Sequence, residues 1–178
     1  MEYPKKFEIH VRLKDGEDLF LRPIRPTDIN LAKEFFKKLS DMTRQLSFFT
    51  RVKDVQDERI LEFITVDYKR SMVVVALNKG EIVGAIRYGW DNEDETLELK
   101  ETVRDDWHGK GVGTALFKHI IEIAKDNGYN TAKAQILSEN TKAINLFQKG
   151  GFDINFKWKG NYVVLTFDIS EVNDISHG

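Results

Sequence analysis

The feature that most constrains this chain is a short run containing three glycines, Trp107-His108-Gly109-Lys110-Gly111-Val112-Gly113. The residues before it, 96–103, alternate as in a β-strand, and those after it, 111–126, repeat as in an amphipathic helix. Glycines at the start of a helix let backbone N–H groups face an anion with no Cβ in the way, and the helix dipole adds about half a positive charge there. The sequence therefore predicts a turn that binds a phosphate or pyrophosphate.

Several interpretations of this run compete. A P-loop needs four residues between its first glycine and Gly-Lys-Ser/Thr, a spacing that this chain does not supply. A dinucleotide fingerprint has glycines at positions one, three and six, whereas here they occupy one, three and five, with Thr114 in the sixth place. A glycine-rich helix cap without any ligand is the structural alternative. The neighbouring elements must decide between these interpretations.

Composition limits the class of protein. The chain has 178 residues, 41% of them apolar and 31% charged, so we expect a single domain over 1–178 with its core at about 18–168 and a polar tail over 170–178. A net charge of −2 indicates no nucleic-acid or membrane partner. The lack of cysteine excludes a Cys nucleophile and fits a cytoplasmic location, and four scattered histidines predict no metal site. We find no signal peptide and no apolar run of membrane-spanning length.

Hydrophobic periodicity and turn residues predict the order of the elements. Strands are expected over 7–13, 19–24, 71–78, 81–90, 96–103, 131–137, 152–158 and 162–167. Helices are expected over 26–40, 54–66, 111–126 and 141–149, with a broken helical stretch between the first two. The order β-β-α-α-β-β-β-α-β-α-β-β predicts an α/β (α+β) fold with a mixed, mostly antiparallel sheet of six to seven strands and helices on both faces.

Two motifs in this context resemble the GCN5-related N-acetyltransferases, the GNAT superfamily. That family carries Gln/Arg-x-x-Gly-x-Gly/Ala, found here as His108-Gly109-Lys110-Gly111-Val112-Gly113, and His108 departs from the pattern at its first position. The second motif is Asn140 followed by Phe147-Gln148-Lys149-Gly150-Gly151-Phe152. The resemblance covers about residues 20–167 and implies a single GNAT-like domain that uses acetyl-CoA as co-substrate, with no metal.

A narrower resemblance lies near the ends of this region. Three segments are similar to the Pat-type protein lysine acetyltransferase domains: Leu21-Arg22-Pro23-Ile24-Arg25-Pro26-Thr27-Asp28, Leu39-Ser40 with Phe48-Phe49, and Asp105-Asp106-Trp107. Relatives with the same opening act on other amines. The arginines beside Pro23 either order this corner through ion pairs or shape the acceptor pocket.

The resemblance assigns coenzyme contacts to particular positions. Acetyl-CoA would lie between the parallel strands over 96–103 and 131–137, where Thr102 and Val103 offer backbone groups to the pantetheine arm and the thioester carbonyl. The diphosphate would take the amides of His108, Gly109, Lys110, Gly111, Val112, Gly113 and Thr114. Lys110 either adds a charge or points to solvent. Asn140 would cap its helix and contact the coenzyme arm.

An amine must lose a proton before it attacks, and for a free lysine of pKa about 10.4 this costs roughly 4.6 kcal/mol at pH 7. Glu98 is the expected base, since it occupies the place of the proposed basic glutamate of Pat-type domains and shares a strand face with Lys100 and Thr102. The alternative for Glu98 is a solvated strand residue. Glu101, on the opposite face, is the second candidate.

Many family members use a tyrosine in the short second helix to protonate the departing thiolate, and here Phe147 occupies that position. The acid role is therefore unfilled, which is tolerable because a thiol of pKa near 8.5 leaves as an anion. His119 lies on the apolar stripe of the 111–126 helix and is expected to be a packing residue rather than a base.

These residues predict an acetyl-CoA-dependent N-acetyltransferase in which the amine attacks the thioester directly. The favoured acceptor is a protein lysine, and the second is a small amine such as a polyamine, an amino acid or an aminoglycoside. A coenzyme A-binding sensor or interaction domain with little turnover is the alternative of another class. The last hairpin could pair across a homodimer.

Overall fold

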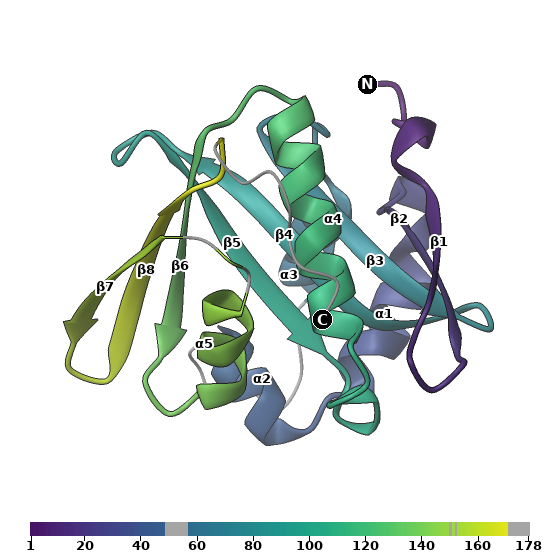
Figure 1. Ribbon diagram of the computed structural model, residues 1–178. Coiled ribbons are helices and arrows are strands. Elements are labelled where there is room, and N and C mark those ends of the chain that lie inside the picture. Colours follow the sequence, from purple (N-terminus) through teal and green to yellow (C-terminus); the bar gives the residue numbers. More distant parts are fainter. Residues whose placement is uncertain (49–56, 150, 152, 171–178) are drawn as a thin grey trace.

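The computed structural model describes residues 1–48, 57–149, 151 and 153–170. Parts of the motifs and elements expected from the sequence, namely Phe49, residues 54–56, Gly150, Phe152 and the tail from 171, lie outside the described residues. Figure 1 shows a single twisted sheet with α4 and α5 on one face, α1 and α3 behind it, and α2 near the carboxyl end of β5.

The sheet has eight strands in the order β1-β2-β3-β4-β5-β6-β8-β7. They are β1 (Ile9–Arg12), β2 (Asp18–Pro23), β3 (Ser71–Asn78), β4 (Glu81–Asp91), β5 (Thr96–Val103), β6 (Thr131–Leu137), β7 (Ile154–Lys159) and β8 (Tyr162–Asp168). Of the described pairs, β5 with β6 is parallel and the others are antiparallel. The predicted fold class is confirmed, and the strand number is eight rather than six to seven because both terminal hairpins join the same sheet.

Five α-helices are described: α1 (Ile29–Lys37), α2 (Asp41–Phe48), α3 (Asp57–Ile64), α4 (Val112–Asp126) and α5 (Thr141–Gln148). Three short 3₁₀ turns, η1 (Lys5–Phe7), η2 (Pro26–Asp28) and η3 (Asp105–Trp107), precede β1, α1 and the glycine run. The expected helix over 26–40 therefore divides into η2 and α1. The broken stretch after it is a separate helix because the Ser40 hydroxyl accepts a hydrogen bond from the Thr43 N–H (3.1 Å) and so caps α2.

Both faces of the central sheet are packed, and β3 shows how. Met72 and Val74 point into the core under α4, whereas Val73 and Val75 point into a second core under α1 and α3. Side chains alternate between faces along a strand, so a strand covered on both sides has to be apolar throughout, as predicted for 71–78.

The main helix, α4, is held by the stripe that its sequence predicts. Val112, Leu116, Ile120 and Ile123 are each at most 1% exposed, and burial of such side chains contributes about 1.5–3 kcal/mol each. His119 lies half-buried beside this stripe, where its Nε2 bonds the Phe7 carbonyl (2.7 Å) and burial lowers its pKa. This agrees with its expected role as a packing residue.

Candidate active site

The parallel strands β5 and β6 are paired over only a short stretch. Their registered pairs are Leu97–Ala132, Glu98–Lys133 and Leu99–Ala134. Beyond Leu99 the two strands diverge toward their carboxyl ends, which Figure 1 shows as a widening V. Backbone groups of β5 that face this gap therefore lack a strand partner on that side.

The register of β5 with β4 identifies which residues face the gap. The Arg104 N–H donates to the Val83 carbonyl (2.9 Å), and in an antiparallel pair alternate residues bond the same neighbour. Thr102 therefore belongs with Arg104 and turns its backbone toward β4, whereas Glu101 and Val103 turn theirs toward the gap. The sequence had assigned these backbone contacts to Thr102 and Val103, so for Thr102 the strand register gives a different arrangement.

The glycine run forms the predicted turn at the start of α4. Gly109 and Gly111 have φ angles of 75° and 94°, in the left-handed region that favours glycine. The first N–H with an acceptor inside the helix is that of Ala115, bonded to the Gly111 carbonyl (3.0 Å). The N–H groups over 112–114 consequently have no acceptor within the helix and are available to an anion.

A cavity of about 670 Å³ opens over this turn, a size suited to an extended ligand. The predicted coenzyme residues that line it are Thr102, Val103, His108, Gly109, Gly111, Val112, Gly113, Thr114 and Asn140. Its wall also includes residues that the sequence did not assign to the coenzyme, among them Met42, Thr43, Glu101, Glu139, Lys142 and Lys149.

Lys110 and Phe147 lie elsewhere. The Lys110 ammonium is 3.7 Å from the Asp15 carboxylate and 4.7 Å from the centre of the Trp107 ring, so it is engaged away from the cavity. The Phe147 ring packs in the core against Phe117, with ring centres 4.9 Å apart. Phe147 thus supplies packing, and it is its neighbours on α5 that border the cavity.

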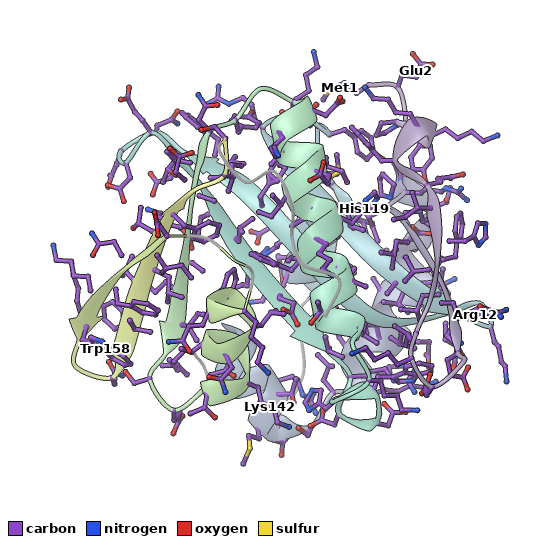
Figure 2. All side chains as sticks on the ribbon, in the orientation of Figure 1. Met1, Glu2, Arg12, His119, Lys142 and Trp158 are labelled. Atoms are coloured by element: carbon purple, nitrogen blue, oxygen red, sulfur yellow. The ribbon has the colours of Figure 1, made fainter. Side chains whose placement is uncertain are left out.

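His108 occupies the position where the family has Gln or Arg. Its Nε2 lies 2.8 Å from the Val103 carbonyl, and its Nδ1 lies 3.2 Å from the Lys142 ammonium. A neutral ring that donates from Nε2 and accepts at Nδ1 satisfies both contacts. Lys142, in the first turn of α5 and labelled in Figure 2, thereby brings a positive charge to the corner of the cavity. No local sequence signal indicates this contact, because Lys142 and His108 are 34 residues apart.

Asn140 performs its predicted capping role. Its side-chain oxygen accepts a hydrogen bond from the Ala143 N–H (3.3 Å) at the start of α5. Asn140 also lines the coenzyme cavity, so the two interpretations of this residue are compatible.

Glu101 points to the α4 side of β5, as strand alternation predicts. Its Oε2 is buried without a hydrogen-bond partner, and burial raises the pKa of the carboxyl to about 7. Of the two candidate bases, Glu101 is the one with a buried carboxyl oxygen that lacks a hydrogen-bond partner. It borders the coenzyme cavity rather than the acceptor cavity.

Glu98 lies on the opposite face, where it is exposed and lines a second cavity of about 650 Å³. Arg87 and Lys100 share that wall and stand directly opposite each other on β4 and β5. Burial, and secondarily the charge of Arg87, lowers the pKa of Lys100 to about 8. Across the residues that the structure describes, the Arg87 guanidinium makes neither an ion pair nor a hydrogen bond.

The two cavities share no lining residue, but a third, smaller space has residues in common with each of them. Thr102 borders the coenzyme cavity and also a small space of about 30 Å³ on the acceptor face. That space shares Glu62, Arg87 and Lys100 with the cavity of Glu98. Where β5 and β6 separate, the sheet therefore has a cavity on the α4 face and a cavity on the acceptor face.

The described residues hold neither a metal-binding cluster nor a membrane-spanning helix. Within residues 1–48, 57–149, 151 and 153–170, no three His, Cys, Asp or Glu side chains are grouped so as to hold a metal ion. In the same ranges, no helix is both long enough and apolar enough to span a bilayer.

Residues 35–152 match the family model described as the acetyltransferase (GNAT) family. The chain belongs to this family. An acetyltransferase of Pseudomonas aeruginosa is 33% identical over 121 residues, 66% of this chain and 65% of that protein. An L-methionine sulfoximine/L-methionine sulfone acetyltransferase of the same species is 36% identical over 98 residues, 49% of this chain and 57% of that enzyme. The matched region thus spans less than two thirds of either relative.

The GNAT domain of S. lividans PAT has a closely similar structure. Its TM-score is 0.89 at 27% sequence identity, with 94% of this chain and 99% of that domain covered. This similarity confirms the fold and agrees with the resemblance to Pat-type domains that the sequence indicated.

Proposed function

We propose that this chain is an acetyl-CoA-dependent N-acetyltransferase that transfers acetyl to a primary amine without an acyl-enzyme. The observation that carries the proposal is the gap between β5 and β6, with the amides at the start of α4 on one face and Glu98 on the other. Thr102 borders both sides, so a thioester held on the α4 face has a route to an amine on the acceptor face.

Each part of this site has a task in the proposed reaction. The amides over 112–114 bind the diphosphate. The backbone groups of Glu101 and the N–H of Val103, whose carbonyl is bonded to His108, hold the pantetheine arm and the thioester carbonyl. One such N–H directed at the developing oxyanion contributes roughly 3–4 kcal/mol. Glu98 takes the proton of the attacking amine, directly or through water, while the C–S bond breaks and the thiolate leaves.

A protein lysine is the proposed acceptor. The likeness to Pat-type domains supports it, as does the acceptor cavity, whose wall carries the carboxylates of Glu62, Asp91, Glu93 and Glu98 against two cations. Asp91 is already paired with Lys133 (2.5 Å), so three carboxylates remain to attract a lysine side chain. From the sequence we expect residues 39–70 and the last hairpin to determine the choice of acceptor, and residues 49–56 of that segment lie outside the described structure.

A second acceptor class is favoured by one observation. Arg87 is a half-buried guanidinium with no ion pair among the described residues, and it faces Lys100 across two strands, where like charges destabilise each other. An acceptor that carries a carboxylate beside its amine would compensate this charge. An amino acid fits that description, and the relative named for L-methionine derivatives supports it.

Thiol release from acetyl-CoA, measured with lysine-containing peptides and with free amino acids, tests the proposal. We expect release with at least one panel. Arg87→Met should raise KM about tenfold or more for a carboxylate-bearing amine and leave the KM for a neutral-flanked lysine peptide nearly unchanged. Binding of coenzyme A without release on any amine would contradict the enzyme and favour a sensor domain.

A further inference from the structure

Glu101 is a carboxylic acid on a strand face that is otherwise apolar. Its neighbours on that face, Leu99 and Val103, belong to the core under α4. The Glu101 side chain instead reaches the first turn of α4, where a Cβ added to Gly113 would lie 2.6 Å from Oε1. The carboxyl therefore rests against the bare Cα of Gly113, at the same helix N-terminus that faces the cavity.

The second observation is that the described residues offer this carboxyl no hydrogen bond at Oε2 and no ion pair. Oε2 is buried with no hydrogen-bond partner, and a buried polar atom left in that state is destabilising. The titratable groups that share the cavity wall come from the turn before α4 and from α5 with the turn before it: Asp105, His108, Glu139, Lys142 and Lys149. None of them forms an ion pair with Glu101 in the described part of the chain.

Two of these neighbouring groups are hydrogen-bonded to residues other than Glu101. Asp105 accepts hydrogen bonds from Ser40 and Thr43, and Lys142 lies against His108. Burial is the cause that raises the pKa of Glu101 to about 7, so near neutral pH the free site is divided between its charged and neutral forms. A diphosphate at the amides over 112–114 brings further negative charge to that corner, which disfavours the charged carboxylate.

We propose that Glu101 is a proton-holding residue of the coenzyme site, and that coenzyme A binds with uptake of one proton by its carboxyl. The neutral carboxyl can donate one hydrogen bond and accept another, so it can satisfy an amide of the pantetheine arm, which the carboxylate cannot do as a donor. This inference rests on the proposed function, because it takes coenzyme A as the ligand.

The sign of the pH dependence follows from linkage. Coenzyme binding raises the pKa of Glu101 above its value of about 7 in the free protein. Below pH 7 the carboxyl is already neutral and the affinity is at its maximum. Above pH 7 a proton must be taken up, so Kd rises by up to about tenfold per pH unit until the pH reaches the higher pKa of the complex.

Calorimetric titration of the whole chain with coenzyme A at pH 6, 7, 8 and 9, in two buffers of different ionisation enthalpy, tests this directly. The buffer dependence should report uptake of close to one proton at pH 8 and almost none at pH 6. Glu101→Gln, which mimics the neutral carboxyl, should bind about equally tightly at all four pH values and take up no proton. Glu122→Gln, which removes an exposed carboxylate from α4, should retain the wild-type behaviour.

The outcomes separate the two claims. Binding by the wild-type chain without proton uptake, or the same pH dependence in Glu101→Gln and wild type, overturns the role of Glu101 and leaves the coenzyme site intact. If no coenzyme A binds at any pH, the proposed function itself fails. The proton count of the wild-type chain decides the matter even where Glu101→Gln does not fold.

Discussion

Two glutamates on β5 show how one strand serves two chemical tasks. Glu98 and Glu101 are an odd number of residues apart, so they face opposite sides of the sheet, one toward the acceptor cavity and the other toward the coenzyme cavity. Glu98 is exposed, whereas burial raises the pKa of Glu101 to about 7. In our account the first accepts a proton from the amine and the second holds one beside the coenzyme.

Replacement of Glu98 tests its role as base. We expect Glu98→Gln to lower kcat/KM about 10²–10³-fold at neutral pH, with the rate recovering as the pH approaches the pKa of the amine, where the nucleophile is already deprotonated. Glu95→Gln, an exposed residue of the preceding hairpin, is the matched control and should keep the wild-type pH–rate profile. The same profile in Glu98→Gln as in wild type would remove Glu98 from the mechanism.

At the scale of elements, the turn into α4 was the most predictable part of the site. Local rules for glycine and for helix N-termini were sufficient, because the groups that bind are backbone groups of consecutive residues. The contact of Lys142 with His108 joins α5 to this turn across 34 residues, and no local rule gives it. The positions of Lys110 and Phe147 were not predictable for the same reason. Lys110 pairs with Asp15 and Phe147 packs against Phe117, and both partners are distant in sequence.

Between β2 and α1, a buried ion pair leads to a prediction about stability rather than activity. Arg22 and Asp28 are about 5% exposed and form a two-point ion pair at 2.7 and 2.9 Å, and Asp28 also accepts the Arg25 N–H. Of the two interpretations of the Arg-Pro-Ile-Arg segment, ion pairing is confirmed. Asp28→Asn leaves a buried arginine without its partner, so we expect a loss of about 3–5 kcal/mol in the free energy of unfolding.

Urea denaturation measures that loss. Asp18→Asn removes the carboxylate of an exposed pair with Arg12 and is the control, for which we expect little change in the midpoint. Equal midpoints for Asp28→Asn and Asp18→Asn would show that burial of the Arg22–Asp28 pair has no bearing on stability.

At the scale of the whole molecule, the sheet separates the coenzyme from the acceptor. The sequence predicted the order of strands and helices along the chain and the presence of helices on both faces, because hydrophobic periodicity reflects which side chains are buried. It did not predict that both terminal hairpins join one eight-stranded sheet, because pairing such as that of β6 with β8 depends on contacts between distant segments. The sequence likewise did not predict that the backbone of Glu101, rather than that of Thr102, faces the gap between β5 and β6. That depends on the pairing register of β4 with β5.

This separation predicts that variants on one face leave the other unchanged. Lys142→Met should weaken coenzyme A binding about fivefold, roughly 1 kcal/mol, because it removes an exposed charge at the cavity corner, and the acceptor KM should not change. Glu98→Gln should leave the Kd for coenzyme A unchanged. Titration calorimetry and acceptor kinetics on both variants check this, and a large effect of Glu98→Gln on the coenzyme Kd would show that the faces are coupled.

The central claim is that main-chain N–H groups at the start of α4 hold the diphosphate of coenzyme A, and calorimetric comparison of coenzyme A with pantetheine tests it most directly. Pantetheine carries the thiol arm without the diphosphate. We predict that coenzyme A binds and that pantetheine binds at least about 100-fold more weakly, since the amides at the helix N-terminus then lack their anion. No heat with millimolar coenzyme A, or equal affinity for the two ligands, would contradict the account.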